Sequence, residues 1–289
     1  MTKKIGVVTD TNACLDYFDH DEDIPIMRSI IHLGDEEFID HVELTADAFY
    51  ARIESDASLF PKTSQPATTS MVEIYQSMQA KGYTDLVVVT ISSHMSGIYS
   101  AAQVAATHVP ELNVTVFDSR SVAYPQAMMA LKAASLAREG ASLETILDAI
   151  THIRDHNHIY FAVDTLAYLV KNGRLSNAQG FLGSMLKIKP LLHISKAGKV
   201  ENIEKIRTFT KAVNRVIEMY HQETKGKKVM PFICHANNPE VRDFIEAQLK
   251  AADPTIQSVF SMPLTPAVGA HAGPKAIGLG YFIAADKAS

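Results

Sequence analysis

Residues 63–69 form a hydroxyl-rich turn that could hold an anion. The segment reads Thr63-Ser64-Gln65-Pro66-Ala67-Thr68-Thr69, and its proline favours extended backbone at the residue before it. Thr63 and its neighbours therefore offer hydroxyl and amide donors ahead of a helix expected near Thr69. A capped turn without any ligand explains the same residues, because Thr68 or Thr69 can accept a hydrogen bond at the helix N-terminus.

A second segment places Ser96 and Gly97 shortly after a predicted strand, Leu86–Ile91, and before a predicted helix. In open α/β sheets, ligands bind beyond the carboxyl ends of the strands. A helix that begins there presents free amides and the positive end of its dipole to an anion. Gly97 allows close approach of the backbone. Since about two or three donors hold a carboxylate in its ionised form, we expect an anion site at Ser96.

Ser96 could instead be a catalytic nucleophile. Position 94 is His, so the segment lacks the Gly-x-Ser-x-Gly turn of one large hydrolase fold. Other serine hydrolases need a histidine oriented by an acid, and the chain has 12 histidines. A Ser-dependent acyl hydrolase therefore stays open as the alternative hypothesis.

His271 is flanked by Gly269 and Gly273, a pattern typical of a tight turn. Pro274 would suit the first turn of a following helix. An imidazole at this turn could donate a hydrogen bond to a carboxylate or phosphoryl oxygen. A structural or surface histidine is the other interpretation of the same residue.

Two arginines are candidates for contact with a phosphate or a partner. Arg174 follows Asn172 and Gly173, which indicate the end of a short helix, and its guanidinium could reach a phosphate from between two helices. Arg207 lies beside Thr208 at another predicted helix start. Helix punctuation with surface arginines is the other interpretation of both positions, although it does not explain the particular combination of residues around Arg174, and the case for Arg207 is the weaker of the two.

Metal and nucleotide chemistry find little support. The histidines between residues 152 and 158 are not surrounded by a zinc motif with glutamate. The sequence contains neither a P-loop nor a dinucleotide glycine fingerprint. We therefore expect no cofactor and no metal ion in this chain.

Short apolar runs followed by helical patterns predict an α/β fold with mostly parallel sheets. Val87 to Val89 form a continuous apolar run, as expected for a strand covered on both faces. We expect an N-terminal α/β domain at residues 1–158 and a C-terminal α/β domain at 159–289. The predicted strands are Ile5–Thr9, Leu86–Ile91, Val114–Phe117, Ile159–Val163, Val229–Cys234 and Ile256–Met262. The predicted helices are Thr69–Lys81, Ile98–Ala106, Ser121–Arg138, Leu143–Arg154, Lys211–Gln222 and Glu240–Ala251.

Composition describes an ordinary globular chain. It has 289 residues, 47% of them hydrophobic, and 20% charged, which is enough for a sizeable core. The pI of about 6.2 disfavours nucleic-acid binding, although residues 164–215 are locally basic. No apolar run reaches the about 18–20 residues of a membrane span. Two cysteines without close spacing argue against a disulfide framework, so we expect a cytoplasmic location.

Taken together in their order, these motifs resemble the DegV family, whose members include the fatty-acid-binding subunits of bacterial fatty-acid kinase. The resemblance runs from residue 5 to about 280. It implies a two-domain α/β fold, with mostly parallel sheets flanked by helices and a long apolar lipid tunnel. The matching motifs are Val8-Thr9-Asp10, Thr63-Ser64-Gln65-Pro66, Ser92-Ser93 with Ser96-Gly97-x-Tyr99, Asp118-Ser119, Tyr168-Leu169-x-Lys171-x-Gly173-Arg174 and Gly269-x-His271-x-Gly273-Pro274.

The resemblance also implies a ligand and a partner. A fatty-acid carboxylate is expected at the positions matching Thr63 and Ser96, with the Gly97 amide and His271 nearby. Arg174, and less directly Arg207, would contact the kinase subunit or the acyl phosphate. ATP and magnesium belong to that partner, which would phosphorylate the carboxylate.

Three hypotheses follow for the function. The first is a non-catalytic subunit that binds and presents a fatty acid, with transient contact to a membrane surface. The second is the Ser-dependent acyl hydrolase. The third is a lipid sensor without a kinase partner.

Overall fold

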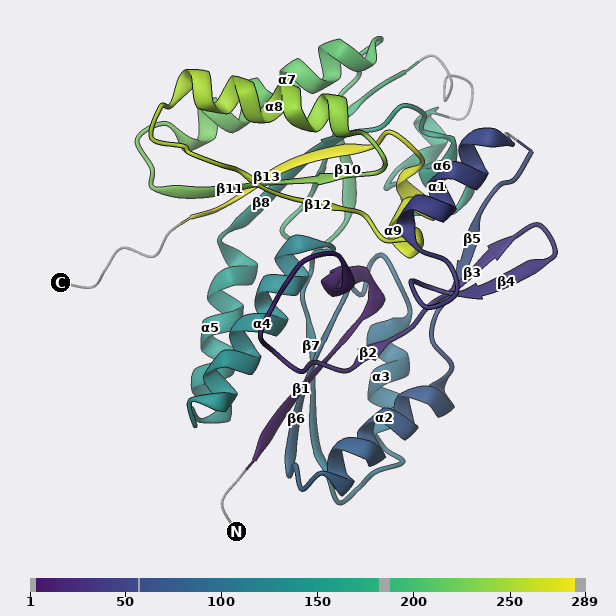
Figure 1. The fold of residues 1–289 in the computed structure, drawn as a ribbon, viewed down its shortest axis with the longest axis vertical. Helices are drawn as coiled ribbons and strands as arrows, with labels where there is room; N and C mark the ends of the chain where they lie inside the picture. Colours follow the sequence, from purple (N-terminus) through teal and green to yellow (C-terminus); the bar gives the residue numbers. More distant parts are fainter. Residues whose placement is uncertain (1–3, 57, 182–187, 284–289) are drawn as a thin grey trace.

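The computed structural model describes residues 4–56, 58–181 and 188–283. In these ranges the strands form three sheets (Figure 1). The first sheet has the order β2-β1-β6-β7, and all of its neighbouring strands are parallel. Its strands are β1 (Ile5–Asp10), β2 (Ile26–Met27), β6 (Asp85–Thr90) and β7 (Asn113–Asp118).

The parallel sheet matches the sequence prediction closely. Every residue of β6 is buried, as the continuous apolar run predicts for a strand covered on both faces. The helices around it are α2 (Thr68–Ala80), α3 (Ile98–Ala106), α4 (Tyr124–Arg138) and α5 (Leu143–Asp155). Ser142 caps α5 by accepting a hydrogen bond from the Thr145 amide. In contrast, α2 begins after Ala67 without a side-chain cap, so the predicted caps Thr68 and Thr69 are wrong.

The second sheet has the order β10-β9-β8-β13-β11-β12, and all of its pairs except β11–β12 are antiparallel. Mostly parallel pairing therefore holds for the first sheet and not for the second. The central strand β13 was missed in sequence because Gly278 and Gly280 dilute its apolar pattern, and Pro274 precedes this strand instead of a helix. The strands are β8 (Asn157–Ala162), β9 (Leu191–Ile194), β10 (Val200–Glu204), β11 (Val229–His235), β12 (Phe260–Pro263) and β13 (Ile277–Ile283).

A small antiparallel sheet with the order β4-β3-β5 lies beside the helix α9 (Pro266–Ala272), which contacts both β3 and β5. Its strands are β3 (Ile30–Leu33), β4 (Glu36–Ile39) and β5 (Lys62–Ser64). The remaining helices are α1 (Ala46–Ser55), α6 (Ala167–Lys171), α7 (Phe209–Thr224) and α8 (Pro239–Ala252).

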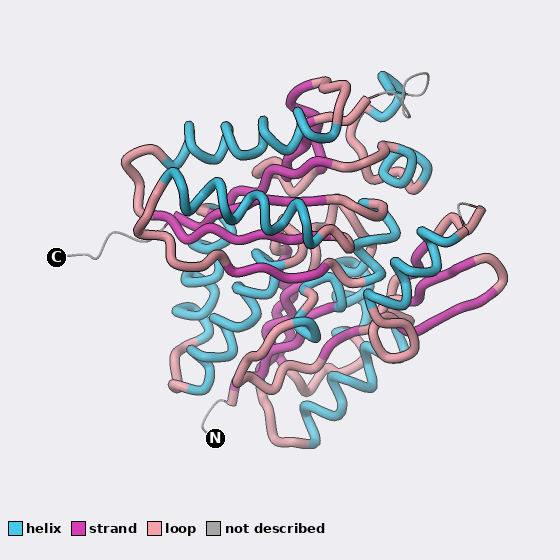
Figure 2. The backbone as a smooth tube through the Cα atoms, turned by 45° about the horizontal axis from the view of Figure 1, so that its top comes forward, coloured by secondary structure: helices cyan, strands magenta, loops and turns pink. Residues whose placement is uncertain are grey.

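Three apolar cores hold these layers together. The helices α7 and α8 cover the outer face of the second sheet (Figure 1, Figure 2), and α2 and α3 cover the outer face of the first sheet. The largest core lies between the two sheets and contains residues from both, including Val87 of β6 and Phe232 of β11, together with α4. The boundary between domains at residues 158 and 159 remains a prediction.

Candidate functional site

A cavity of about 330 Å³ lies between the two large sheets, within the size range of small-molecule sites. Residues that follow strands of the first sheet, residues of the second sheet and residues of α9 line it, and most of them are apolar. Its apolar walls include Ile91, Val122, Ala123, Ile159, Phe161, Leu169, Ile194, Val200, Cys234, Leu264, Ala267, Val268, Ala276 and Ile277.

Polar side chains enter this cavity where strands of the first sheet end. Ser96 and Gly97 follow β6, and Asn12 follows β1; all three line the cavity. The carboxyl ends of parallel strands meet at one sheet edge, which explains why residues far apart in sequence come together here. The amide of Ile98, the first residue of α3, donates to the Ser96 hydroxyl at 3.3 Å. Ser96 therefore lies at the start of α3, as predicted.

At Gly97 the loop after β6 comes close to the Gln65 side chain of the loop after β5. A Cβ atom built on Gly97 would lie 2.4 Å from Oε1 of Gln65, which is closer than unbonded heavy atoms approach. The loop after β5 and the loop after β6 therefore pack directly against each other. This contact brings the first hydroxyl-rich segment to the same cavity as Ser96.

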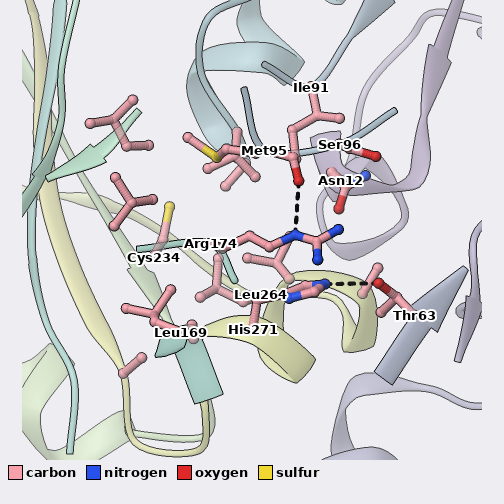
Figure 3. Close-up of a pocket in the computed structure, with 18 of the residues that line it drawn as sticks. Asn12, Thr63, Ile91, Met95, Ser96, Leu169, Arg174, Cys234, Leu264 and His271 are labelled. Carbon is pink, nitrogen blue, oxygen red and sulfur yellow. Dashed lines mark hydrogen bonds between the residues drawn. The ribbon is translucent and has the colours of Figure 1, made fainter. Parts of the chain in front are cut away.

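Thr63 and His271 form a hydrogen-bonded pair at the cavity wall (Figure 3). Oγ1 of Thr63 lies 2.8 Å from Nε2 of His271, while Nδ1 of His271 is buried and has no hydrogen-bond partner among the described residues. Burial, aided by the positive charge of Arg174, lowers the pKa of His271 to about 4. The imidazole is therefore neutral at pH 7.

His271 lies within α9 and not in a turn, so the predicted turn is wrong. Gly269 is required because a Cβ there would lie 2.3 Å from the Tyr50 hydroxyl. Gly273 ends α9 with a positive φ of 78°, and a Cβ there would lie 2.6 Å from the Tyr168 ring. The two glycines thus allow α9 to pack closely against α1 and α6.

Arg174 extends toward the polar end of the cavity from the loop after α6 (Figure 3). Its Nε donates to the Met95 carbonyl at 3.0 Å, and its Nη1 donates to the Asn172 carbonyl at 2.5 Å. Asn172 in turn donates to the Ala270 carbonyl of α9 at 2.9 Å. Partial burial lowers the pKa of Arg174, but a guanidinium keeps its charge in proteins. A fixed positive charge therefore lies beside His271 and the loop of Ser96.

The structure brings together five of the six residues singled out from the sequence. Thr63, Ser96, Gly97, Arg174 and His271 all line the cavity. Arg207 does not; it is exposed just before the N-cap residue of α7. The roles of these residues in binding a ligand or a partner remain predictions.

Four further polar residues line the cavity and were not singled out as site residues: Asn12, Ser29, Ser64 and Gln65. Asn12 could have been found by the same rule as Ser96, since it follows the carboxyl end of a parallel strand. Ser64 and Gln65 belong to the hydroxyl-rich turn itself. Ser29 lies between two short strands that the sequence pattern did not reveal.

Within the described ranges, no group of three or more His, Cys, Asp or Glu side chains is arranged to hold a metal ion. In the same part of the chain, no helix is both long enough and apolar enough to cross a membrane.

Comparison with known proteins places the chain in a family. The family model described as DegV matches residues 4–284. The chain belongs to the DegV family. Protein DegV of Bacillus subtilis is 34% identical over 278 residues, which cover 95% of this chain and 98% of that protein.

Solved DegV structures share the fold. The crystal structure of DegV from Bacillus subtilis, described as a fatty acid binding protein, has a TM-score of 0.85 at 32% identity and covers 98% of this chain and 100% of its own. A fatty acid binding DegV family protein from Streptococcus agalactiae has a TM-score of 0.86 at 26% identity, with 98% and 99% covered. The α/β fold expected for a DegV protein is therefore confirmed.

Proposed function

We propose that this protein binds a long-chain fatty acid in the cavity and presents its carboxylate to a separate ATP-dependent kinase subunit, which forms an acyl phosphate. One observation carries the proposal: the polar groups of Ser96, His271 and Arg174 gather at one end of a cavity whose other walls are apolar. The two DegV proteins above, described as fatty acid binding, support the class of ligand.

The two parts of the cavity suit the two parts of a fatty acid. Burial of an acyl chain contributes about 0.8 kcal/mol per methylene, so the apolar walls supply the driving force. A buried carboxylate is costly unless it is hydrogen-bonded and its charge is balanced. The Ser96 hydroxyl and the Gly97 amide can donate to it, the Thr63 hydroxyl orients His271 beside it, and the Arg174 guanidinium balances its charge.

His271 can add a donor without being charged. In the tautomer that carries its proton on Nδ1, Nε2 accepts from the Thr63 hydroxyl and Nδ1 donates to the ligand. The geometry of the site suits this arrangement, because Nε2 is paired with Thr63 and Nδ1 is buried with no hydrogen-bond partner among the described residues. A neutral donor of this kind holds a carboxylate without itself titrating near pH 7.

Phosphorylation is assigned to the partner. ATP and magnesium would be bound by the kinase subunit, and the cavity would supply the carboxylate at its polar end. Arg174 would also stabilise the added phosphoryl group, and the exposed Arg207 would contact the kinase. Transient contact with a membrane surface would allow the fatty acid to be exchanged.

The pairing of His271 supports binding over hydrolysis. A serine hydrolase uses a histidine that is hydrogen-bonded to its nucleophile. Here the His271 imidazole is paired with Thr63, while the hydrogen bond at the Ser96 hydroxyl comes from the Ile98 amide. Ser96 is therefore assigned as a hydrogen-bond donor to the ligand.

Native mass spectrometry of the purified protein tests this function, with a stoichiometric long-chain fatty acid expected. Ser96→Ala should weaken retention of the acid about tenfold, because one hydrogen bond to a charged group is lost. Ser93→Ala is the matched control, since Ser93 is exposed in the same loop and its hydroxyl donates to Asp118 instead. A protein that holds no fatty acid and hydrolyses esters spontaneously would refute the proposal, as would unchanged retention in Ser96→Ala.

A further inference from the structure

The apolar part of the cavity extends over the middle of the second sheet. Cys234 of β11 and Gly278 of β13 are register partners, and both line the cavity. Cys234 lies on the opposite side of the pocket from Thr63 and Ser96 (Figure 3). This part of the cavity is therefore the end away from the polar groups.

At the next pair of residues along the same face of the sheet, a side chain covers the backbone. Residues two apart on a strand share a face and lie about 7 Å apart. The next pair after Cys234 and Gly278 is therefore Phe232 and Gly280, which are also register partners. A Cβ on Gly280 would lie 2.2 Å from Cζ of Phe232, so the phenyl ring lies directly over the bare backbone of Gly280.

Further aromatic rings pack against Phe232. The centroid of its ring lies 5.2 Å from that of Tyr124 and 5.1 Å from that of Phe282. The Tyr124 ring also stacks on Phe260 at 4.2 Å. We call Tyr124, Phe232, Phe260 and Phe282 the aromatic wall. Because rings packed in this way leave little free volume, the wall cannot yield to an extra methylene without disturbing several neighbours.

We propose that the aromatic wall, with Phe232 at its front, closes the tail end of the cavity and sets the longest acyl chain that the protein holds. This inference rests on the proposed function and specifies which acyl chain lengths the protein selects. Because the carboxylate head group is held at Ser96 and His271, the distance from these residues to Phe232 limits the length of the acyl chain. Gly278 provides the space immediately in front of the wall.

Chain-length selection tests the inference directly. Delipidated protein is incubated with an equimolar ladder of lauric, myristic, palmitic, stearic, arachidic and behenic acids, and the retained acids are identified by native mass spectrometry. Phe232→Leu and Phe232→Ala should raise the longest retained acid by at least one step. Gly278→Ala should lower it, because its new methyl group takes up space in front of the wall and would lie 3.3 Å from Cδ1 of Ile159.

Tyr220→Leu is the matched control. Tyr220 is a buried ring in the core on the other face of the same sheet, so its loss should leave the chain-length range unchanged. If Phe232→Ala does not fold, Phe232→Leu and Gly278→Ala still decide the question. An unchanged range in the folded variants, with fatty acid bound by the wild type, overturns only the role of the wall. Absence of any fatty acid in the wild type overturns the proposed function and this inference with it.

Discussion

His271 is a neutral histidine placed next to an arginine. Burial and the charge of Arg174 lower its pKa to about 4, and its ring is oriented by Thr63. Arg174 lies 97 residues and Thr63 lies 208 residues before it in the sequence. They make the imidazole a fixed hydrogen-bond donor instead of a group that titrates near neutrality.

The lowered pKa predicts a pH dependence of stability. Unfolded His271 titrates near 6.5, so the folded state binds fewer protons between pH 6.5 and 4. Its contribution to stability is complete above pH 6.5 and is lost as pH falls toward 4. From pH 7 to pH 5 the wild type should lose about 2 kcal/mol relative to His271→Gln. Urea unfolding of both proteins at the two pH values measures this difference, and parallel curves would show that His271 is not buried as described.

The helix α9 depends on a carboxylate from another segment. Thr265 precedes α9, but its side chain makes no capping bond to the helix. The Thr265 hydroxyl instead donates to Asp40 at 2.7 Å, and the Ala267 amide of α9 donates to the same carboxylate at 3.3 Å. The Thr11 hydroxyl donates to it at 2.6 Å. Asp40 therefore joins the start of α9 to the segment after β1.

Asp40 should give a pH dependence of the opposite sign. Burial raises its pKa to about 6 from an unfolded value of 3.8, so the folded state binds more protons between pH 4 and 6. Its contribution to stability is complete below about pH 4 and is lost as pH rises through 6. Relative to Asp40→Asn, the wild type should lose about 3 kcal/mol between pH 3.5 and pH 7.

Guanidinium unfolding of wild type and Asp40→Asn at several pH values checks this expectation. The hydrogen bonds lost in Asp40→Asn lower the free energy of unfolding of the variant by a similar amount at every pH. Loss of the titrating carboxyl group instead changes the slope of the free energy of unfolding against pH. A constant difference between the two proteins across this range would contradict a buried, titrating Asp40.

At the scale of the whole molecule, the two arginines proposed to contact the acyl phosphate or the kinase subunit lie in different surroundings. Arg174 is half-buried at the cavity and bonded to the Met95 carbonyl. Arg207 is exposed before α7, outside the cavity lining. Only Arg207 therefore offers a test of partner contact that leaves the ligand site intact.

Arg207→Ala should leave fatty-acid retention unchanged but lower the rate of acyl-phosphate formation with the kinase subunit by about fivefold or more, because a charge at the contact is lost. Arg215→Ala is the matched control on α7, where Arg215 is paired with Glu204 and Glu218. Acyl phosphate formed by fatty-acid-loaded protein is measured for each variant. Equal rates for wild type and Arg207→Ala would exclude Arg207 from the contact.

Local patterns in the sequence were enough to predict three of the four strands of the parallel sheet, β1, β6 and β7, and the helices around them, but not the two-residue strand β2. Apolar runs such as Val87 to Val89 need both faces covered, and the helix Ile98–Ala106 was predicted with the bounds that α3 has. The rule that ligands bind beyond strand ends also identified Ser96 and Gly97. These features are local, since they depend on residues near one another in the chain.

The tertiary structure alone decided which groups meet at the site and what surrounds each of them. The pairing of Thr63 with His271 and the contact of Arg174 with Met95 join segments that have no local relation. The central strand β13 escaped prediction because two of its positions are glycines, whose role depends on contacts with other segments. Gly278 lines the cavity, and Gly280 leaves room for the ring of Phe232 on the neighbouring strand. The role of a glycine can be assigned only when its neighbour in space is known. The sequence by itself therefore determined which hydrogen-bond donors the protein has, and tertiary packing determined which groups those donors contact.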